Sequence, residues 1–358
     1  MTGSSELKLE CLAIGSLPHN NLENAMSLVK KCFANVPFWP QLTKINKNED
    51  MIIQFLENMP SFFIDNDKCY LETESDKFFE DIEQFYSDYE EIIGQNYSSL
   101  EKYAVTDNCS SSFKEFIKIV EQTKPAYAKG QIVGPFTLAT TLVDKQGRCA
   151  IYDETLREII VKTLTLKALW QIQEIKKANF NTKPIIFIDE PSISQLGTSA
   201  FITISQNEVL DILKEIAGII KAGGALCAIH CCGKCDWNVP IKAGVDIINL
   251  DAYSYAQNLS LFKNDLEKFL LNGGKIAWGV IPTLDKDALE NADLNSMIKV
   301  FQNGVKYLTN KGINEKLIID NSIITPSCGA GGLSINLAEK AMNLTKQLSD
   351  SLKERYQI

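Results

Sequence analysis

A histidine and two cysteines lie together in the segment Ala228-Ile229-His230-Cys231-Cys232-Gly233. The segment ends an apolar run, Ala225 to Ile229, that is typical of a buried strand. If the strand period of two continues, the side chains of His230 and Cys232 lie on the same face. Imidazole nitrogen and thiolate sulfur are ligands that zinc prefers. The spacing therefore indicates part of a metal site at the end of a strand.

A third ligand must come from elsewhere in the chain, and Cys328 is the candidate. It lies in Thr325-Pro326-Ser327-Cys328-Gly329, downstream of an apolar run, Leu317 to Ile319, that we expect to be a strand. Three protein ligands with one open position are typical of catalytic zinc. The alternative is that these are ordinary buried cysteines, which behave as small hydrophobic residues, and a histidine at a strand end.

Cys235 offers a second alternative, because Cys232-x-x-Cys235 has the spacing of a zinc knuckle. With His230 and Cys328 it would complete a closed structural site in a module without enzymatic activity. We favour the catalytic site, because a large barrel needs no structural metal in order to fold.

Composition limits the classes of protein to consider. The chain has 358 residues, of which 45% are hydrophobic and 23% charged, and it contains no apolar run long enough to span a bilayer. A net charge of -9 argues against nucleic acid as the main partner. Residues 1–10 lack the pattern of a signal peptide, so we expect a cytoplasmic protein with reduced cysteines.

Short apolar runs alternate with helical patterns along most of the chain, which predicts parallel strands joined by right-handed crossovers. We expect an α/β fold of the (β/α)8 TIM-barrel type, forming one domain over residues 1–358, with a helical and hairpin elaboration at about 51–122. A doubly wound sheet is the alternative, but no G-x-G-x-x-G follows the first strand. The expected strands are Leu9–Ile14, Ala126–Val133, Ile185–Ile188, Leu226–Ile229, Ile247–Leu250, Lys275–Val280 and Leu317–Ile319, with an eighth near Ser61–Ile64.

Polar residues follow several of these strands, and in a barrel such loops meet at one rim where catalysis takes place. Ile14-Gly15-Ser16 ends the first strand, and its backbone amides suit a carboxylate or a phosphate. Asp189 and Glu190 follow another strand, and we expect both to act at the rim as catalytic residues. The apolar loop from Val36 to Leu42 is expected to line an open rim.

These motifs, in this order, resemble the catalytic barrel of cobalamin-independent methionine synthase over nearly the whole chain. The motifs are Ile14-Gly15-Ser16, Ile188-Asp189-Glu190-Pro191, His230-x-Cys232, Asp251 and Pro326-Ser327-Cys328-Gly329. The same architecture is shared by the uroporphyrinogen decarboxylase superfamily, which includes methylcobalamin:coenzyme M methyltransferases. The chain departs from methionine synthase at Asp251, where that family has a glutamate, and in its glycine-rich segment after Cys328.

The resemblance implies a Zn²⁺ ion on His230, Cys232 and Cys328, with Asp251 or water as fourth ligand. It further implies that the zinc activates a small thiol such as homocysteine for methylation, with Asp189 on the substrate ammonium and the amides near Ser16 on its carboxylate. Because residues 51–122 are acidic, we expect a methyl-corrinoid, free or on a separate protein, as donor in place of folate polyglutamate. The alternative is a uroporphyrinogen decarboxylase-like protein with a structural zinc and no methyl transfer.

Overall fold

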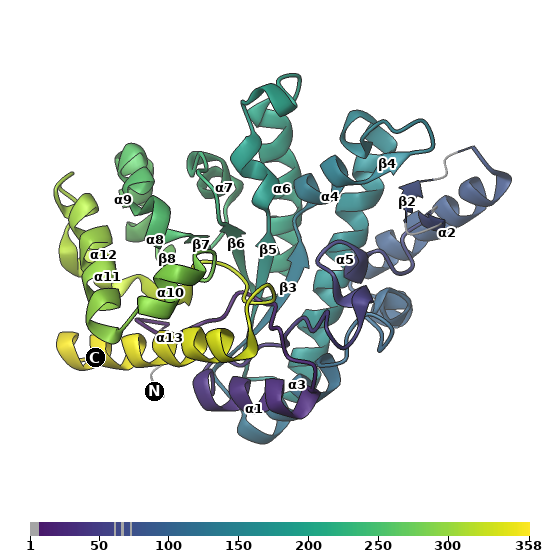
Figure 1. Cartoon of the computed structure of the whole chain (residues 1–358). Helices are drawn as coiled ribbons and strands as arrows, with labels where there is room; N and C mark the ends of the chain where they lie inside the picture. The colour runs from purple at the N-terminus through teal and green to yellow at the C-terminus, as the bar shows by residue number, and fades with distance from the viewer. Residues whose placement is uncertain (1–6, 61, 66–67, 72–73) are drawn as a thin grey trace.

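The computed structural model describes residues 7–60, 62–65, 68–71 and 74–358. Its centre is a curled sheet of six parallel strands in the order β3-β5-β6-β7-β8-β9 (Figure 1). This order never reverses, whereas a doubly wound sheet reverses at its switch point. The α/β class is therefore confirmed, with a barrel-like winding. The strands are β3 (Tyr127–Val133), β5 (Lys183–Asp189), β6 (Leu226–Cys231), β7 (Ile247–Leu250), β8 (Lys275–Ile281) and β9 (Ser322–Pro326).

Two extended segments connect the edges of this sheet through isolated parallel bridges. Cys11 pairs with Ile324 of β9, Ser16 pairs with Gln41, and Phe38 pairs with Lys129 of β3. The strand expected at Leu9–Ile14 is thus an irregular extended segment, and Leu9, with a φ of 53°, interrupts the regular conformation. The regular ladder of the sheet does not close on itself.

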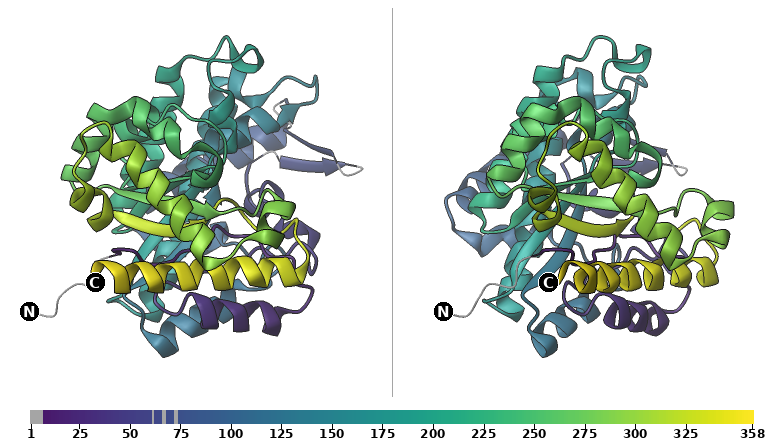
Figure 2. Two further views of the ribbon diagram at one scale, coloured as in Figure 1. Left: turned by 60° about the vertical axis from the view of Figure 1, so that its left-hand side comes forward. Right: turned by 90° about the vertical axis from the view of Figure 1, so that its left-hand side faces the viewer.

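Helices cover the outer face of the sheet, and their starting points follow from the sequence. Ser205 and Glu208 form a capping box at the start of α6, and Asn21 caps α1. The first helix, α1, and the last, α13, lie side by side (Figure 2). The helices are α1 (Leu22–Cys32), α4 (Pro135–Thr141), α5 (Glu154–Ala178), α6 (Gln206–Ala222), α7 (Asn238–Ala243), α8 (Ala252–Tyr255), α9 (Lys263–Leu271), α10 (Lys286–Asn291), α11 (Leu294–Thr309), α12 (Glu315–Asp320) and α13 (Ile335–Tyr356).

The predicted elaboration contains a hairpin and two helices, α2 (Asp76–Ile93) and α3 (Phe113–Thr123). Strands β1 (Phe62–Asp65) and β2 (Lys68–Leu71) pair antiparallel, and β4 (Val143–Asp144) adds a parallel strand to β2. The expected hairpin is confirmed, and residues 61, 66 and 67 lie outside the described residues. The eighth barrel strand expected near Ser61–Ile64 is wrong, because β1 belongs to this separate small sheet.

The strand predicted at Leu317–Ile319 is also wrong. These residues lie in α12, whose start is capped by the Asn314 side chain, and the strand that follows is β9. A short apolar run does not distinguish a buried strand from one buried face of a helix. The error does not change where Cys328 lies, because it still follows a strand of the sheet.

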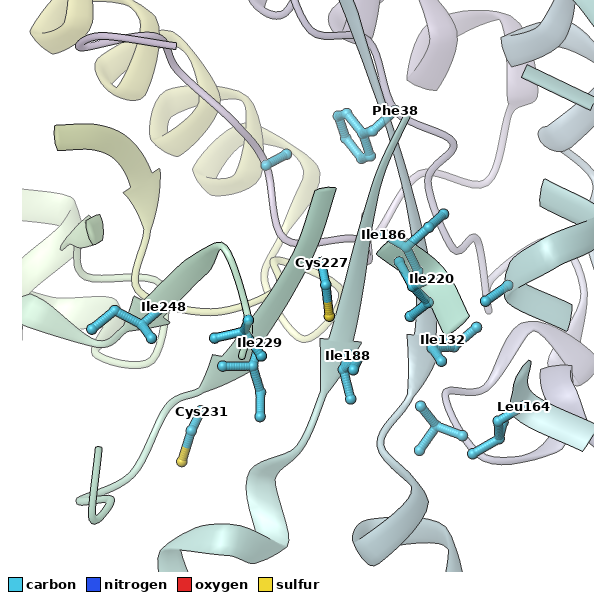
Figure 3. Packing of buried hydrophobic residues seen from close by; sticks show 14 of the residues in the cluster. Phe38, Ile132, Leu164, Ile186, Ile188, Ile220, Cys227, Ile229, Cys231 and Ile248 are labelled. Atoms are coloured by element: carbon cyan, nitrogen blue, oxygen red, sulfur yellow. The ribbon is translucent and has the colours of Figure 1, made fainter. Parts of the chain in front are cut away.

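Alternate residues of the strands divide the core into two layers. Cys227, Ile229 and Cys231 of β6 belong to the large outer cluster beneath the helices (Figure 3), whereas Ala228 belongs to a small inner cluster. His230 therefore faces the interior of the curled sheet, on the same side of β6 as Ala228. The inner cluster comprises Leu7, Leu12, Val36, Ile185, Phe187, Ala228, Ile247, Ala277 and Ile323.

The apolar segment from Val36 to Leu42 does not line an open rim. Val36 packs in the inner cluster, and Phe38, Trp39 and Leu42 are buried. The expectation is wrong because the segment lies between the edges of the sheet, where its backbone bridges β3. Among the described residues, no helix combines the length and the apolar character needed to span a membrane.

Candidate metal centre

Three potential metal-ligand atoms lie close together near the carboxyl ends of β6 and β9. The side chains of His230, Cys232 and Cys328 place one potential ligand atom each within 4.8 Å of the other two, and no other group of this kind occurs in the described part of the chain. With Zn–S bonds of about 2.3 Å, sulfur ligands on one tetrahedral zinc lie about 3.8 Å apart. The cluster therefore fits a single zinc ion with small side-chain movements.

One ring nitrogen of His230 has a hydrogen-bond partner, and the other has none. Its Nδ1 lies 2.5 Å from the side-chain oxygen of Asn249 on β7, the neighbouring strand. Its Nε2 is buried and has no hydrogen-bond partner. A buried nitrogen without a partner is unfavourable unless another group binds it. The geometry thus leaves Nε2 available to a metal ion.

The two cysteines of the cluster share one proton. The Cys328 thiol and, next, the His230 imidazole stabilise the Cys232 thiolate and lower the pKa of Cys232 to about 4. The same contact, together with burial, raises the pKa of Cys328 far above its usual value. Burial alone would lower the pKa of His230, but the contact with the Cys232 thiolate, and next the charge of Asp189, outweigh it and raise that pKa. A metal ion would replace the shared proton, because only deprotonated ligands bind it.

The loop that carries Cys328 is fixed by hydrogen bonds on both sides. The Thr283 hydroxyl donates to the Cys328 carbonyl oxygen at 2.9 Å and accepts from the Cys328 amide at 3.0 Å. On the other side, the Ala330 amide donates to the Ser16 carbonyl oxygen at 2.9 Å, and the Gly331 amide donates to the Ser16 hydroxyl at 3.1 Å. A Cβ on Gly329 would overlap the Ser16 hydroxyl, so this close approach requires glycine.

Asp189, at the end of β5, is paired in register with His230 and lies beside the cluster. It is 5% exposed, and its Oδ1 has no hydrogen-bond partner. Burial raises the pKa of Asp189 to about 6, against the opposing effect of the Lys129 ammonium. Lys129 itself is fully buried in β3, and burial lowers its pKa to about 8.

Glu190 directly follows β5, at the carboxyl end of the strand, and is completely buried. One carboxylate oxygen accepts from the backbone amide of Thr137, and the other accepts from the amide of Phe136 at 3.2 Å. These amides belong to the first turn of α4, where a carboxylate is favoured by the free N–H groups. Burial raises the pKa of Glu190 to about 7. Its contacts bind it to α4, and the catalytic role predicted for it stays a prediction.

The remaining predicted residues lie near the cluster, with other partners. The Ile14 carbonyl oxygen accepts from the Lys129 ammonium, and the Gly15 carbonyl oxygen accepts from the Gln41 amide. The Asp251 carboxylate is buried, caps α8 through the Ser254 amide at 3.0 Å, and is not part of the three-residue group. Burial raises the pKa of Asp251.

Cys235 is not part of the group either. It lies buried in the outer cluster with Cys231, and these two thiols contact each other. In the described residues the three ligand atoms that lie close together are those of His230, Cys232 and Cys328. The thiol of Cys235 lies outside this group, so the four ligands of the closed site are not brought together.

Sequence reasoning missed the polar residues that lie within the strands, at positions facing the interior. Asn249 and Thr325 are completely buried and hydrogen-bond to each other, and Lys129 and Gln131 of β3 are completely buried as well. The signal was present, because each of these residues interrupts an otherwise apolar run, as in Ile247-Ile248-Asn249-Leu250. A buried polar side chain needs partners. Those of Asn249 lie on β6, β8 and β9, and those of Lys129 and Gln131 include the carbonyl oxygens of the two extended segments.

Comparisons with known proteins agree with the motifs. No protein-family model matches the chain. A methionine synthase from Methanocaldococcus jannaschii is 29% identical over 214 residues, which is 59% of this chain, and the chain thus spans about 60% of the length of that relative. The solved structure of a B12-independent methionine synthase from Shewanella sp. W3-18-1, in complex with selenomethionine, matches with a TM-score of 0.47 and 14% identity over 68% of this chain and 67% of that one. The sequence match to the curated methionine synthase confirms the resemblance predicted from the motifs, over 214 residues of the chain.

Proposed function

We propose that this chain is a zinc-dependent methyltransferase that methylates a small thiol, homocysteine or a related compound, with a methyl-corrinoid as the donor. The observation that carries the proposal is the meeting of three soft ligand atoms within 4.8 Å at the ends of two strands. The relationship to methionine synthase supports methyl transfer to sulfur. The orphaned Nε2 of His230 supports a metal ion at this position.

The ligand set suits alkyl transfer to a thiol. A bound Zn²⁺ lowers the pKa of a coordinated thiol, so that the thiolate is present at neutral pH. The contact with the Cys328 thiol and the His230 imidazole lowers the pKa of Cys232 to about 4, which favours its thiolate, and Cys328 would give up its proton on becoming a ligand. Two thiolates and a neutral imidazole together balance the charge of the ion, which keeps electron density on the substrate sulfur.

We further propose that the sheet and its two extended segments together correspond to an eight-stranded barrel. The six strands take six of the positions, and the segments around Cys11 and Phe38 take the other two through their bridges to β9 and β3. In such a barrel the catalytic groups lie beyond the carboxyl ends of the strands. His230, Asp189 and Cys328 occupy such positions, at or just after the ends of β6, β5 and β9.

Asp189 is proposed to bind the cationic end of the substrate. Its carboxylate is buried beside the cluster and has an oxygen without a partner, which an ammonium group would satisfy. No cation lies within ion-pair distance of it in the described structure. The Ser16 side chain already holds the loop of Cys328, so a carboxylate group there would use the backbone amides of this segment.

We propose that the fourth zinc position is left to water or to the substrate thiol. Asp251 accepts a hydrogen bond from the Ser254 amide, and its side chain lies outside the three-residue group. Displacing a weakly held water requires less reorganisation than removing a buried carboxylate. The open position is also the arrangement typical of catalytic zinc.

The donor is proposed to be a methyl-corrinoid because the chain offers little that would attract a polyanionic folate. The net charge of -9 disfavours binding of a polyglutamate tail. Leu284, which follows β8, is 58% exposed, and Tyr253, which follows β7, is 38% exposed. These residues give the strand ends a partly apolar surface, which suits a large cofactor with an apolar face.

One set of assays tests the proposal. Protein purified without chelators is expected to contain one zinc ion per chain and to demethylate methylcobalamin in the presence of homocysteine. Coenzyme M is tested as a second thiol, and methyltetrahydrofolate polyglutamate as a second donor. Turnover with the folate alone would refute the corrinoid donor, and active protein without zinc would refute the metal centre.

A further inference from the structure

We infer that Asn249, fixed by Thr325 and a backbone carbonyl, sets the tautomer of His230 so that Nε2 carries the lone pair that faces the two cysteines. Asn249 is thus a positioning residue, acting through the imidazole. The inference rests on the proposed function only for the identity of the ion that Nε2 would meet. The tautomer itself is a property of the protein without metal.

The orientation of the Asn249 side-chain amide follows from its partners. Its Nδ2 lies 2.8 Å from the Ala277 carbonyl oxygen and 2.8 Å from the Thr325 hydroxyl oxygen. A backbone carbonyl only accepts hydrogen bonds, so the NH₂ group of Asn249 must face Ala277. The reversed amide would bring two acceptor oxygens together in a site that water does not reach, because Asn249 is completely buried.

The orientation of the amide in turn fixes the proton on the imidazole. With its NH₂ group on the far side, Asn249 presents Oδ1 to His230 Nδ1 at 2.5 Å. An amide oxygen has no proton to donate, so Nδ1 must carry one. In the neutral ring the other nitrogen, Nε2, is then unprotonated, as a metal ligand must be. The absence of any hydrogen-bond partner at Nε2 agrees with this tautomer.

The register of the strands explains why these residues meet. His230 pairs with Asn249, and Asn249 pairs with Ala277. Ala277 pairs with Ile323, two residues before Thr325. The hydrogen-bonded chain therefore crosses four adjacent strands next to the inner apolar cluster, to which Ala277 belongs. Because every member is buried, it has no alternative partner in solvent, and the network has a single fully bonded arrangement.

The test is NMR of the imidazole nitrogens in ¹⁵N-labelled protein without metal, at a pH where the rings are neutral. The chain has only two histidines, so the signals that remain in a His19→Gln variant belong to His230. His230 is expected to be protonated at Nδ1 and unprotonated at Nε2. A ring protonated at Nε2 in the wild-type protein would overturn the inference, whether or not the protein binds zinc.

Three variants separate positioning from simple structural support. Asn249→Leu removes the acceptor, so the ring should lose its tautomer preference and zinc affinity should fall about 10- to 100-fold. Asn249→Asp keeps an acceptor and should retain the Nδ1–H tautomer. Thr325→Val leaves the Ala277 carbonyl oxygen to orient the amide and should also retain it. An Asn249→Leu protein with an unchanged tautomer and unchanged zinc affinity would contradict the inference.

Failure of the proposed function gives a different result. If the wild-type protein has the Nδ1–H tautomer but binds no zinc, the inference stands and the metal centre fails. If zinc binds and the methyl group is transferred but His230 is protonated at Nε2 in the metal-free protein, the proposed function stands and the inference fails. Should Asn249→Leu fail to fold, the wild-type spectrum still decides.

Discussion

Replacing Cys328 by alanine should remove tight zinc binding and leave the fold intact. The thiol is one of three ligand groups in the cluster, and it comes from a loop about one hundred residues away from the other two. Alanine removes the sulfur atom and leaves the backbone contacts of the loop with Thr283 and Ser16 in place. The variant therefore tests the ligand and not the loop.

The magnitude follows from the free energy of zinc binding. Structural zinc sites bind with about 10–16 kcal/mol, so that one of four ligands accounts for roughly 3 kcal/mol, or about a hundredfold in dissociation constant. The cost to folding should be about 1 kcal/mol or less, because Cys328 is only partly buried and a single atom is lost. Binding and stability should thus respond very differently.

A second effect is expected in the protein without metal. The Cys328 thiol is the main group that lowers the pKa of Cys232 to about 4, so its removal should raise that pKa. The ultraviolet absorbance of the thiolate, followed against pH, reports this change directly. The wild-type signal should persist into acid, whereas that of the variant should disappear at a higher pH.

The zinc assay is competition with a chromogenic chelator, and Cys149→Ala is the matched control, since Cys149 is also a partly buried free thiol but lies outside the cluster. Cys149→Ala should keep wild-type affinity. A Cys328→Ala protein with the affinity of the control would refute the assignment of Cys328 as a ligand. An unchanged Cys232 titration would refute the shared proton.

Four further outcomes are expected. Asp189→Asn should raise the KM for an amino-acid thiol with little change in melting temperature; a large loss of stability with unchanged KM would instead indicate a structural brace. Cys235→Ala should leave zinc content unchanged, and loss of zinc on elemental analysis would support the closed site. Gly329→Ala should weaken zinc binding, because its Cβ would displace the Ser16 hydroxyl, whereas the control Gly332→Ala has open space and should not. Lys167→Met should stabilise the protein at neutral pH, because burial lowers the pKa of Lys167 from 10.5 to about 8. The free energy of unfolding of the wild-type protein should therefore fall by up to about 3 kcal/mol as the pH falls from above 10.5 through 8. Equal melting curves of the two proteins from about pH 7 to 10 would contradict this.

The strands that could be predicted are those whose apolar runs carry through most of the strand. The runs at Ile247–Leu250 and Lys275–Val280 matched β7 and β8. Leu317–Ile319 was misassigned because three apolar residues fit one face of a helix as well as a strand. The segment at Leu9–Ile14 was predicted as a regular strand, but the backbone conformation at Leu9 is not visible in its side-chain pattern.

The cluster could be predicted because its ligands lie at strand ends, whereas the residues that orient it could not be found by the same rule. Asn249 and Thr325 lie inside strands whose other residues are apolar, and nothing in their types indicates a function. What marks them is burial, which forces each to find a polar partner, and only the register of the sheet shows that the partner of Asn249 is His230.

The same argument explains why the polar groups can be buried beside a metal site without destabilising the fold. The Asn249 side chain donates both amide protons and accepts at its oxygen, so it leaves little hydrogen-bonding capacity unsatisfied. The two buried atoms left over near the centre, Nε2 of His230 and Oδ1 of Asp189, belong to side chains on paired positions of neighbouring strands. A structural network would satisfy both atoms internally. In the proposed function, Nε2 of His230 would bind the zinc ion and Oδ1 of Asp189 the ammonium group of the substrate, so each atom would gain the partner that it lacks in the protein alone.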